Sequence, residues 1–181
     1  MNSFTQLEVA VISYLQDYIE QRGLRALIHF ELEGCYQLPL GKRIDYKKIN
    51  QKLLHLGVDG EVVAEYWSNQ WEYVSLFNGQ SPLKEAHNLK QALYLLPKIF
   101  ASQGVTNTLI KPVVWAGDYG KLALGCKNIF SADNRAVHIP NAVQINVSVQ
   151  DSAGSNLLVT GDFAERLQRN FLQTSLACCL V

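Results

Sequence analysis

The stretch Val58–Phe77, VDGEVVAEYWSNQWEYVSLF, predicts a β-hairpin. Residues 61–67 and 71–77 are rich in valine, tyrosine, tryptophan and phenylalanine, which favour a pleated and half-buried strand. The three polar residues between them, 68–70, suit a short reversal of the chain. An Asp-Gly pair before the hairpin and an Asn-Gly pair after it are typical turn dipeptides and bound the unit on both sides.

A three-residue loop would place Trp67 opposite Trp71 and Glu65 opposite Tyr73, all on one face of the hairpin. The opposite face would then be aliphatic and would form the core side. Two interpretations of the aromatic face stay open. It is either a second core layer covered by helices, or an accessible platform of Trp67, Trp71, Tyr73 and Glu65 that binds a ring, a base or a partner side chain.

The composition predicts one globular domain over residues 1–181. The chain is 48% hydrophobic, and a chain of this length buries roughly 70% of its unfolded surface. Lysine plus arginine equals aspartate plus glutamate, 16 against 16, so strong whole-surface attraction to nucleic acid or membrane is not expected. No apolar run approaches the ~20 residues of a membrane span, and the N-terminal residues lack a signal-peptide pattern. We therefore expect a cytoplasmic protein.

Apolar periodicity and turn residues predict an α+β fold. The expected helices cover 3–22, 46–56, a segment from Pro82 to about 103, and 163–178. Beyond the hairpin, the expected strands cover 24–32, 108–116, 135–139, 142–150 and 156–160. Because the strands follow one another as hairpins, we expect a mostly antiparallel sheet of about six to eight strands with three or four helices packed against it.

A polar constellation lies on the strand predicted over 24–32 and just beyond it. His29, Glu31 and Glu33 alternate along the chain and therefore share one face. They are candidates for part of a divalent metal site or for an acid–base pair. The alternative is an ordinary solvated face of an antiparallel sheet. No complete set of metal ligands is recognisable from spacing, so neither a metal nor a cofactor is predicted.

A basic cluster precedes and covers the helix predicted over 46–56. It consists of Lys42, Arg43, Lys47, Lys48 and Lys52. This cluster is either a solvated helix face or a patch that binds phosphate or acidic groups. A metal-dependent nuclease would need acids such as Glu31, Glu33 or Glu65 beside it, but the strand 61–67 has Trp67 where the nuclease pattern requires lysine.

Three classes of function remain. The nucleophile elbow, the H-E-x-x-H motif, the phosphate loop and the dinucleotide fingerprint are missing from the sequence. This favours a non-enzymatic binding or adaptor protein that uses the aromatic hairpin face or a cavity between sheet and helices. The alternatives are a nucleic-acid-binding protein or nuclease, and a small-molecule enzyme using His29 and Glu31. Whether the protein is an enzyme stays open. A protein partner or small ligand is favoured over nucleic acid, and the oligomeric state is open, a homodimer included.

Overall fold

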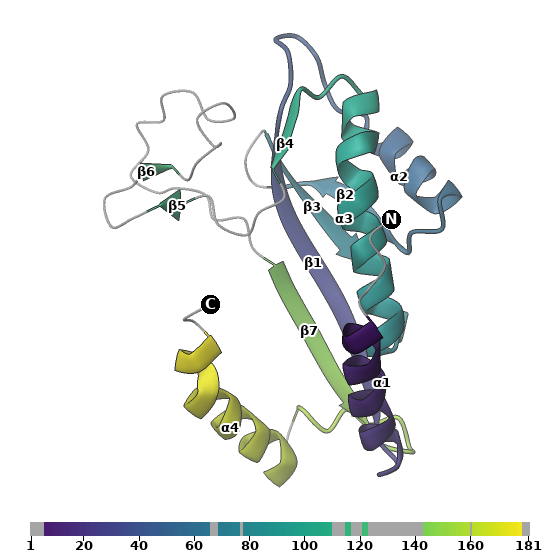
Figure 1. The fold of residues 1–181 in the computed structure, drawn as a ribbon, viewed down its shortest axis with the longest axis vertical. Coiled ribbons are helices and arrows are strands. Elements are labelled where there is room, and N and C mark those ends of the chain that lie inside the picture. Colours follow the sequence, from purple (N-terminus) through teal and green to yellow (C-terminus); the bar gives the residue numbers. More distant parts are fainter. Residues whose placement is uncertain are drawn as a thin grey trace. The chain divides into compact units, whose positions relative to one another are not determined.

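The computed structural model describes residues 6–65, 69–76, 78–109, 115–116, 121–122, 143–159 and 161–178. They form an α+β fold, as predicted, with four helices within the described ranges (Figure 1). The helices are α1 (Gln6–Glu20), α2 (Tyr46–His55), α3 (Pro82–Ser102) and α4 (Asp162–Cys178). The strands are β1 (Arg25–Gln37), β2 (Gly60–Ala64), β3 (Gln70–Ser75), β4 (Asn107–Leu109), β5 (Trp115–Ala116), β6 (Lys121–Leu122) and β7 (Val143–Gln150).

The main sheet is antiparallel and has five strands in the described part of the chain. Its order is β2-β3-β1-β4, and β7 also pairs with β1. The strands β5 and β6 form a separate two-stranded ribbon. The expectation of a sheet of six to eight strands is not confirmed within the described residues. The strand expected over 135–139 lies outside the described residues.

The chain divides into two compact units, which are described separately here. The first comprises Met1, His29–Asn78 and Lys84–Asn146. The second comprises Asn2–Ile28, Gly79–Leu83 and Val147–Val181. The expectation of a single domain stays a prediction.

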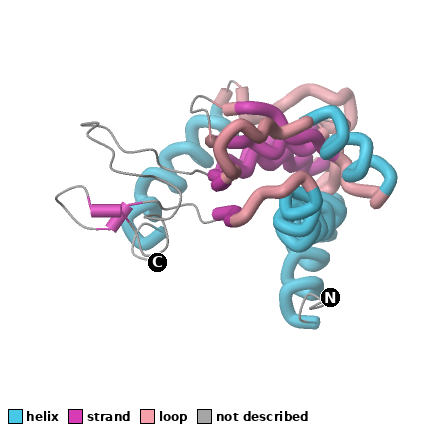
Figure 2. The backbone as a smooth tube through the Cα atoms, turned by 90° about the horizontal axis from the view of Figure 1, so that it is seen from above, coloured by secondary structure: helices cyan, strands magenta, loops and turns pink. Residues whose placement is uncertain are grey.

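The core of the first unit lies between the sheet and the helices α2 and α3. Ile49 and Leu53 come from α2, and Leu96 and Phe100 come from α3; all four are fully buried. They meet Trp71 and other residues from β1, β2 and β3 in one cluster. In Figure 1 α3 runs along the sheet, and in Figure 2, seen from above, the strands of the main sheet gather in one group. Both helices were predicted, and Asp45 caps α2 as expected, accepting a hydrogen bond from Lys48 N at 3.1 Å.

The hairpin exists, but its register differs from the predicted one by three residues. Val62, rather than Glu65, lies opposite Tyr73, and Ala64 lies opposite Trp71. Because the side-chain period of a strand is two, an odd shift exchanges the faces of one strand relative to its partner. Val62 and Tyr73 therefore share the core face, and the expectation of a purely aliphatic core face is corrected.

Two asparagines attach the helices to the edge strand β2. Asn50 of α2 accepts a hydrogen bond from Val62 N at 2.7 Å and donates one to Val62 O at 3.0 Å. Asn88 of α3 makes the same pair of bonds with the backbone of Asp59, both at 2.8 Å. Asn50 therefore satisfies the two backbone groups that Val62 leaves open on the edge strand, whereas Asp59 precedes β2 and its carbonyl also accepts a hydrogen bond from Leu76 N. Gly60 lies directly against the Tyr73 ring, where a Cβ atom would overlap it.

Three element boundaries differ from the sequence prediction. The strand β1 continues to Gln37, through a segment expected to be a turn, because Gly34 and Cys35 pair with β3. The helix α3 continues through Pro97, where proline predicts a kink or an end of the helix. The expected strand over 156–160 is replaced by a turn with a single bridge between Gln150 and Asn156, whose Oδ1 atom accepts hydrogen bonds from Val149 N and Leu158 N.

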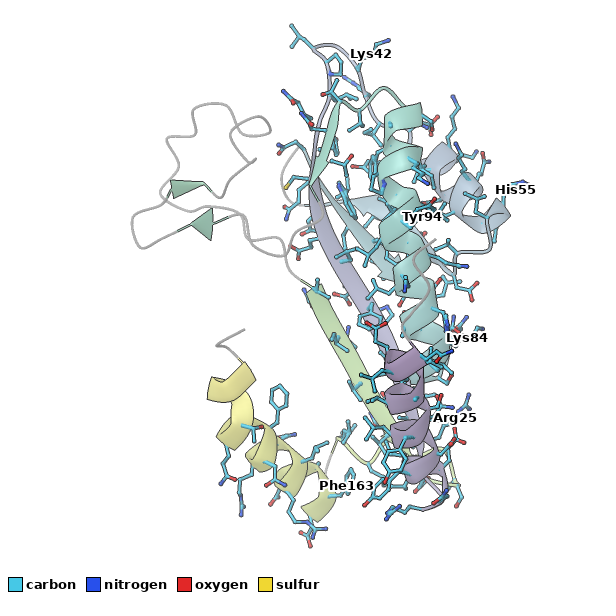
Figure 3. All side chains as sticks on the ribbon, in the orientation of Figure 1. Arg25, Lys42, His55, Lys84, Tyr94 and Phe163 are labelled. Carbon is cyan, nitrogen blue, oxygen red and sulfur yellow. The ribbon has the colours of Figure 1, made fainter. Side chains whose placement is uncertain are left out.

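The second unit contains α1 and α4. Arg25 Nη2 donates a hydrogen bond to Gly79 O at 3.0 Å, and Ile28 N donates one to Gln80 O at 3.1 Å (Arg25 is labelled in Figure 3). Many of the apolar side chains whose periodicity predicts these two helices are exposed. The exposed apolar side chains include Leu7, Tyr14 and Leu15 of α1 and Phe163, Leu167, Phe171 and Leu172 of α4.

The strand β7 also departs from its expected burial. Of the alternating apolar residues expected to point inward, Val149 is buried but Val143, Ile145 and Val147 are exposed. Alternation shows which residues share a face of a strand, but it does not show whether anything covers that face.

None of the described helices is both long enough and apolar enough to cross a membrane.

Candidate functional site

Four partly buried glutamates share the face of the sheet that lies opposite the core, which also carries the exposed Glu61 of β2. Glu31 and Glu33 lie on β1, Glu72 lies on β3 directly opposite Glu33, and Glu65 follows β2. Glu65 N donates a hydrogen bond to Gln70 O at 3.2 Å, which brings Glu65 to the same end of β3 as Glu72. All four side chains are partly buried. We call this set, Glu31, Glu33, Glu65 and Glu72, the acidic face.

The negative charge of the acidic face is concentrated around Glu72. Burial, and then repulsion by Glu65, Glu31 and Glu33, raises the pKa of Glu72 above its usual range. Within the described part of the chain, neither Glu65 nor Glu72 forms an ion pair with lysine or arginine. The face is therefore a region of partly buried, mutually repelling carboxylates, which is an electrostatic surrounding suited to a cation.

His29 and Glu31 lie on the same face, as the sequence predicts, and an asparagine from β7 connects them. Asn146 Nδ2 donates a hydrogen bond to Glu31 Oε1 at 3.1 Å and lies 3.2 Å from His29 Nδ1. A neutral imidazole with its proton on Nε2 would accept this bond at Nδ1. His29 Nδ1 lies 3.8 Å from Glu31 Oε1, beyond hydrogen-bond length. This separation is within ion-pair distance when the imidazole is protonated, and the role of the two residues as an acid–base pair stays a prediction.

A buried glutamine supports Glu33. Gln70 is 3% exposed, and its Nε2 atom donates a hydrogen bond to Glu33 Oε2 at 3.3 Å. The acidic face thus has two side-chain amides attached to it, with Asn146 holding Glu31 and Gln70 holding Glu33. A carboxylate held in this way keeps its orientation before any ligand arrives.

The aromatic candidates lie elsewhere. Trp71 and Tyr73 have 0% exposure and belong to the core, where Trp71 packs against Phe100 with ring centroids 5.2 Å apart. This corrects the expectation of an accessible platform at these two residues, because their side chains follow the core interpretation instead. Trp67 lies outside the described residues. Of the proposed binding residues that the structure describes, Glu65 lies on the acidic face, whereas Trp71 and Tyr73 lie in the core.

The basic candidates lie on the loop before α2 and on α2 itself. Lys42, labelled in Figure 3, and Arg43 are exposed on the loop. Lys47, Lys48 and Lys52 are exposed on α2. Lys48 pairs with Asp45 at 3.5 Å, and Lys52 Nζ lies 3.4 Å from Ser102 Oγ. Their role in binding acidic groups stays a prediction.

Three residues of the site were not identified from the sequence: Gln70, Glu72 and Asn146. Each joins the face only through strand pairing. Gln70 and Glu72 reach it because β3 pairs with β1, and Asn146 reaches it across more than a hundred residues of chain. The alternation of Glu72 with Trp71 and Tyr73 is visible in the sequence, but only the correct hairpin register assigns the glutamate to the outer face.

The carboxylates of the acidic face do not form a closed cage. Among the described residues, no group of three or more His, Cys, Asp or Glu side chains is arranged so that it would hold a metal ion. Any cation on this face would therefore be held by one or two carboxylates at a time, or after side-chain rotation.

Replacing Glu72 by glutamine is expected to stabilise the protein at neutral pH when no divalent cation is present. A glutamate whose pKa is raised by folding contributes stability at low pH, and this contribution is lost as the pH rises through the folded-state pKa. Glutamine stays uncharged, so the E72Q variant should melt a few degrees above the parent at pH 7, about 2–4 °C, and the difference should vanish toward pH 4. Thermal unfolding in EDTA measures this. An equal or lower melting temperature at pH 7 would contradict the repulsion described above.

Comparison with known proteins gives the class of fold. No family model and no curated protein matches the chain. Among solved structures, one described as "Crystal structure of novel glutamine synthase homolog" is similar, with a TM-score of 0.57 and 18% sequence identity. The similarity covers 83% of this chain and 33% of that structure, so the chain spans about a third of the length of the protein it resembles. At this identity the likeness concerns the α+β fold alone.

Proposed function

We propose that this chain is part of an enzyme that acts on a small molecule, and that its acidic face binds a divalent cation. The observation that carries the proposal is the gathering of four partly buried carboxylates on one face of the sheet; burial, and then repulsion by the other three, raises the pKa of Glu72. Magnesium and manganese ions prefer carboxylate oxygens, and a dication would replace the repulsion among these groups by attraction.

The open arrangement of the carboxylates agrees with such a cation. Mg²⁺ usually keeps several water molecules and binds through only one or two carboxylates together with oxygen atoms of the substrate. Glu31 and Glu33 are neighbours on one face of β1, and each is oriented by a side-chain amide. They are our candidates for these direct ligands. Glu65 and Glu72 would supply charge and bonds to the coordinated water.

The fold likeness suggests the type of reaction. The similar structure is named a glutamine synthase homolog, and the formation of an amide from a carboxylate is a reaction in which a dication can polarise a carbonyl or phosphoryl oxygen. We therefore propose that the reaction takes place on a small carboxylate substrate, whose oxygen atoms the dication would contact. Because the chain spans only part of that structure, the proposal assigns to this chain the binding of the cation and not a complete active site.

The other two hypotheses from the sequence receive less support. A non-enzymatic adaptor would use the aromatic face of the hairpin, and two of its aromatic residues are core residues. A nucleic-acid-binding protein would use the basic cluster, where no described feature points to a base or a phosphate. Both stay hypotheses.

A titration with Mn²⁺ tests the proposal. The signal of free Mn²⁺ in electron paramagnetic resonance should fall as the 181-residue protein is added, with saturable binding below about 1 mM, and Mg²⁺ should compete for the site. The matched control is Glu20→Gln on α1, which removes one carboxylate that does not belong to the acidic face. This variant should bind as the parent does. A parent protein that leaves the Mn²⁺ signal unchanged would rule out the proposed cation site.

A further inference from the structure

The helix α1 has two apolar faces, and only one of them rests on the protein. On that face Val9, Ile12 and Ile19 are half-buried. Gln16 shares this face, and its Oε1 atom accepts a hydrogen bond from Leu83 N at 3.5 Å. The other face carries a row of exposed apolar side chains: Leu7, Val11, Tyr14, Leu15 and Tyr18.

The exposed face of α1 has the spacing of a helix that packs along a second helix. Its residues Leu7, Val11, Tyr14 and Tyr18 are separated by four, three and four positions, which is the repeat of a coiled-coil seam. A helix of about 15 residues is only marginally stable in water by itself. No residue of α1 is fully buried. A second helix on the exposed face would therefore stabilise α1.

The helix α4 presents a matching apolar stripe. Phe163, Leu167 and Phe171 recur every four residues and are exposed, as is Leu172 (Phe163 is labelled in Figure 3). Among the side chains described on α4, Ala164 alone is buried. The stripes of α1 and α4 belong to the same compact unit, and both are exposed, so they do not cover each other within one chain.

The charges beside the two stripes are complementary. Asp17 directly precedes Tyr18 of the α1 stripe, and Arg166 directly precedes Leu167 of the α4 stripe. Because consecutive helical residues are about 100° apart, both charges flank their stripes on the same side. Such positions face each other in an antiparallel pair of helices. Within the described part of the chain, neither Asp17 nor Arg166 forms an ion pair.

A pair of identical α1 helices lacks this complementarity. The helix α1 carries three acids and neither lysine nor arginine, so a second α1 would bring acids toward acids. The helix α4 instead supplies the arginine that α1 lacks. The stripe of α1 is therefore better matched to α4 than to itself.

We propose that these two helices bind a second copy of the chain, with α1 of each copy packed antiparallel against α4 of the other. The two helix pairs are related by a twofold axis, so one symmetric dimer covers both stripes of both copies. The nine exposed apolar side chains of α1 and α4 present roughly 100 Å² each, on the order of 900 Å² in total. A stable interface buries about 800 Å² per partner. The dimer goes beyond the proposed cation site and does not depend on it.

Sedimentation equilibrium of the 181-residue protein, combined with charge reversal, tests the dimer. The parent should dimerise with a dissociation constant below about 10 µM. Asp17→Arg and Arg166→Asp, made singly, each replace two attractive pairs of the dimer by two repulsive ones. Each should weaken dimerisation about 10-fold or more. The matched control is Arg169→Asp, because Arg169 lies about 200° around α4 from Leu167 and away from the stripe. This control should dimerise as the parent does.

Mixing the two reversal variants shows whether the contact joins two copies. In a heterodimer of D17R with R166D, residue 17 of each copy faces residue 166 of the other with opposite charge. Both attractive pairs are then restored, with their signs exchanged. The equimolar mixture should therefore dimerise within about threefold of the parent affinity, although each variant alone does not. A contact within one chain cannot be repaired by mixing.

Three results would overturn the dimer. The first is a parent protein that stays monomeric at about 100 µM, and the second is a reversal variant that dimerises as the parent does. The third is a mixture that stays as weakly associated as its components. If a reversal variant loses its helical circular dichroism, Leu7→Glu replaces it, because a glutamate near a helix N-terminus favours the helix while placing a charge in the stripe. Parent-like dimerisation of L7E would equally contradict the proposal.

Discussion

Replacing Trp71 by alanine is expected to lower the free energy of unfolding by about 3–5 kcal/mol, which is a large part of the total stability of a domain. The reason is the position of the side chain. It has 0% exposure, lies in the centre of the core cluster and packs against Phe100 at a tilt of 38°. Alanine would leave a cavity that the rigid sheet and α3 cannot close. Urea denaturation followed by circular dichroism measures the change.

Trp71→Phe is the control for this substitution. Phenylalanine keeps most of the aromatic volume, and it removes the indole Nε1 atom, which is buried without a hydrogen-bond partner within the described residues. The cost of W71F should therefore stay below about 1.5 kcal/mol. If W71A unfolded at the same urea concentration as the parent, Trp71 would be an accessible residue, and the core described here would be incorrect.

The second large effect is expected for the double variant Glu31→Gln and Glu33→Gln. These residues are the proposed direct ligands of the cation, and glutamine keeps their shape while removing both charges. We expect Mn²⁺ affinity to fall by about 100-fold or more, equivalent to ~2.8 kcal/mol of binding free energy. Paramagnetic resonance of free Mn²⁺ provides the measurement, as for the parent protein.

The stability of the double variant separates a loss of ligands from a loss of structure. The two substitutions also remove charges that raise the pKa of Glu72, so the protein without cations should be as stable as the parent or more stable. Parent-like affinity in a folded double variant would exclude Glu31 and Glu33 as ligands.

Local sequence features predicted the helices well. Asp45 before α2 and the Ser-Pro pair before α3 are helix-start residues, and both helices begin where these residues indicate. The alternation of His29, Glu31 and Glu33 likewise showed correctly that they share a face. Each of these predictions depends only on neighbouring residues.

Features that depend on strand pairing were not predictable in the same way. The hairpin register was wrong because the sequence does not show which residues form the loop, and the shift placed Glu65 beside Tyr73 instead of on the face of Glu72. The acidic face itself needs β1 to pair with β3, although the two strands are separated by α2 and β2. The spacing of residues along one strand does not show which other strand it pairs with.

The most direct test of the central claim is a crystal structure of the protein soaked with Mn²⁺, in which anomalous scattering locates the metal. The account predicts an anomalous peak within about 2.5 Å of carboxylate oxygens of Glu31 or Glu33. A fully occupied manganese site elsewhere in the protein, or no peak on this face at saturating Mn²⁺, would contradict it.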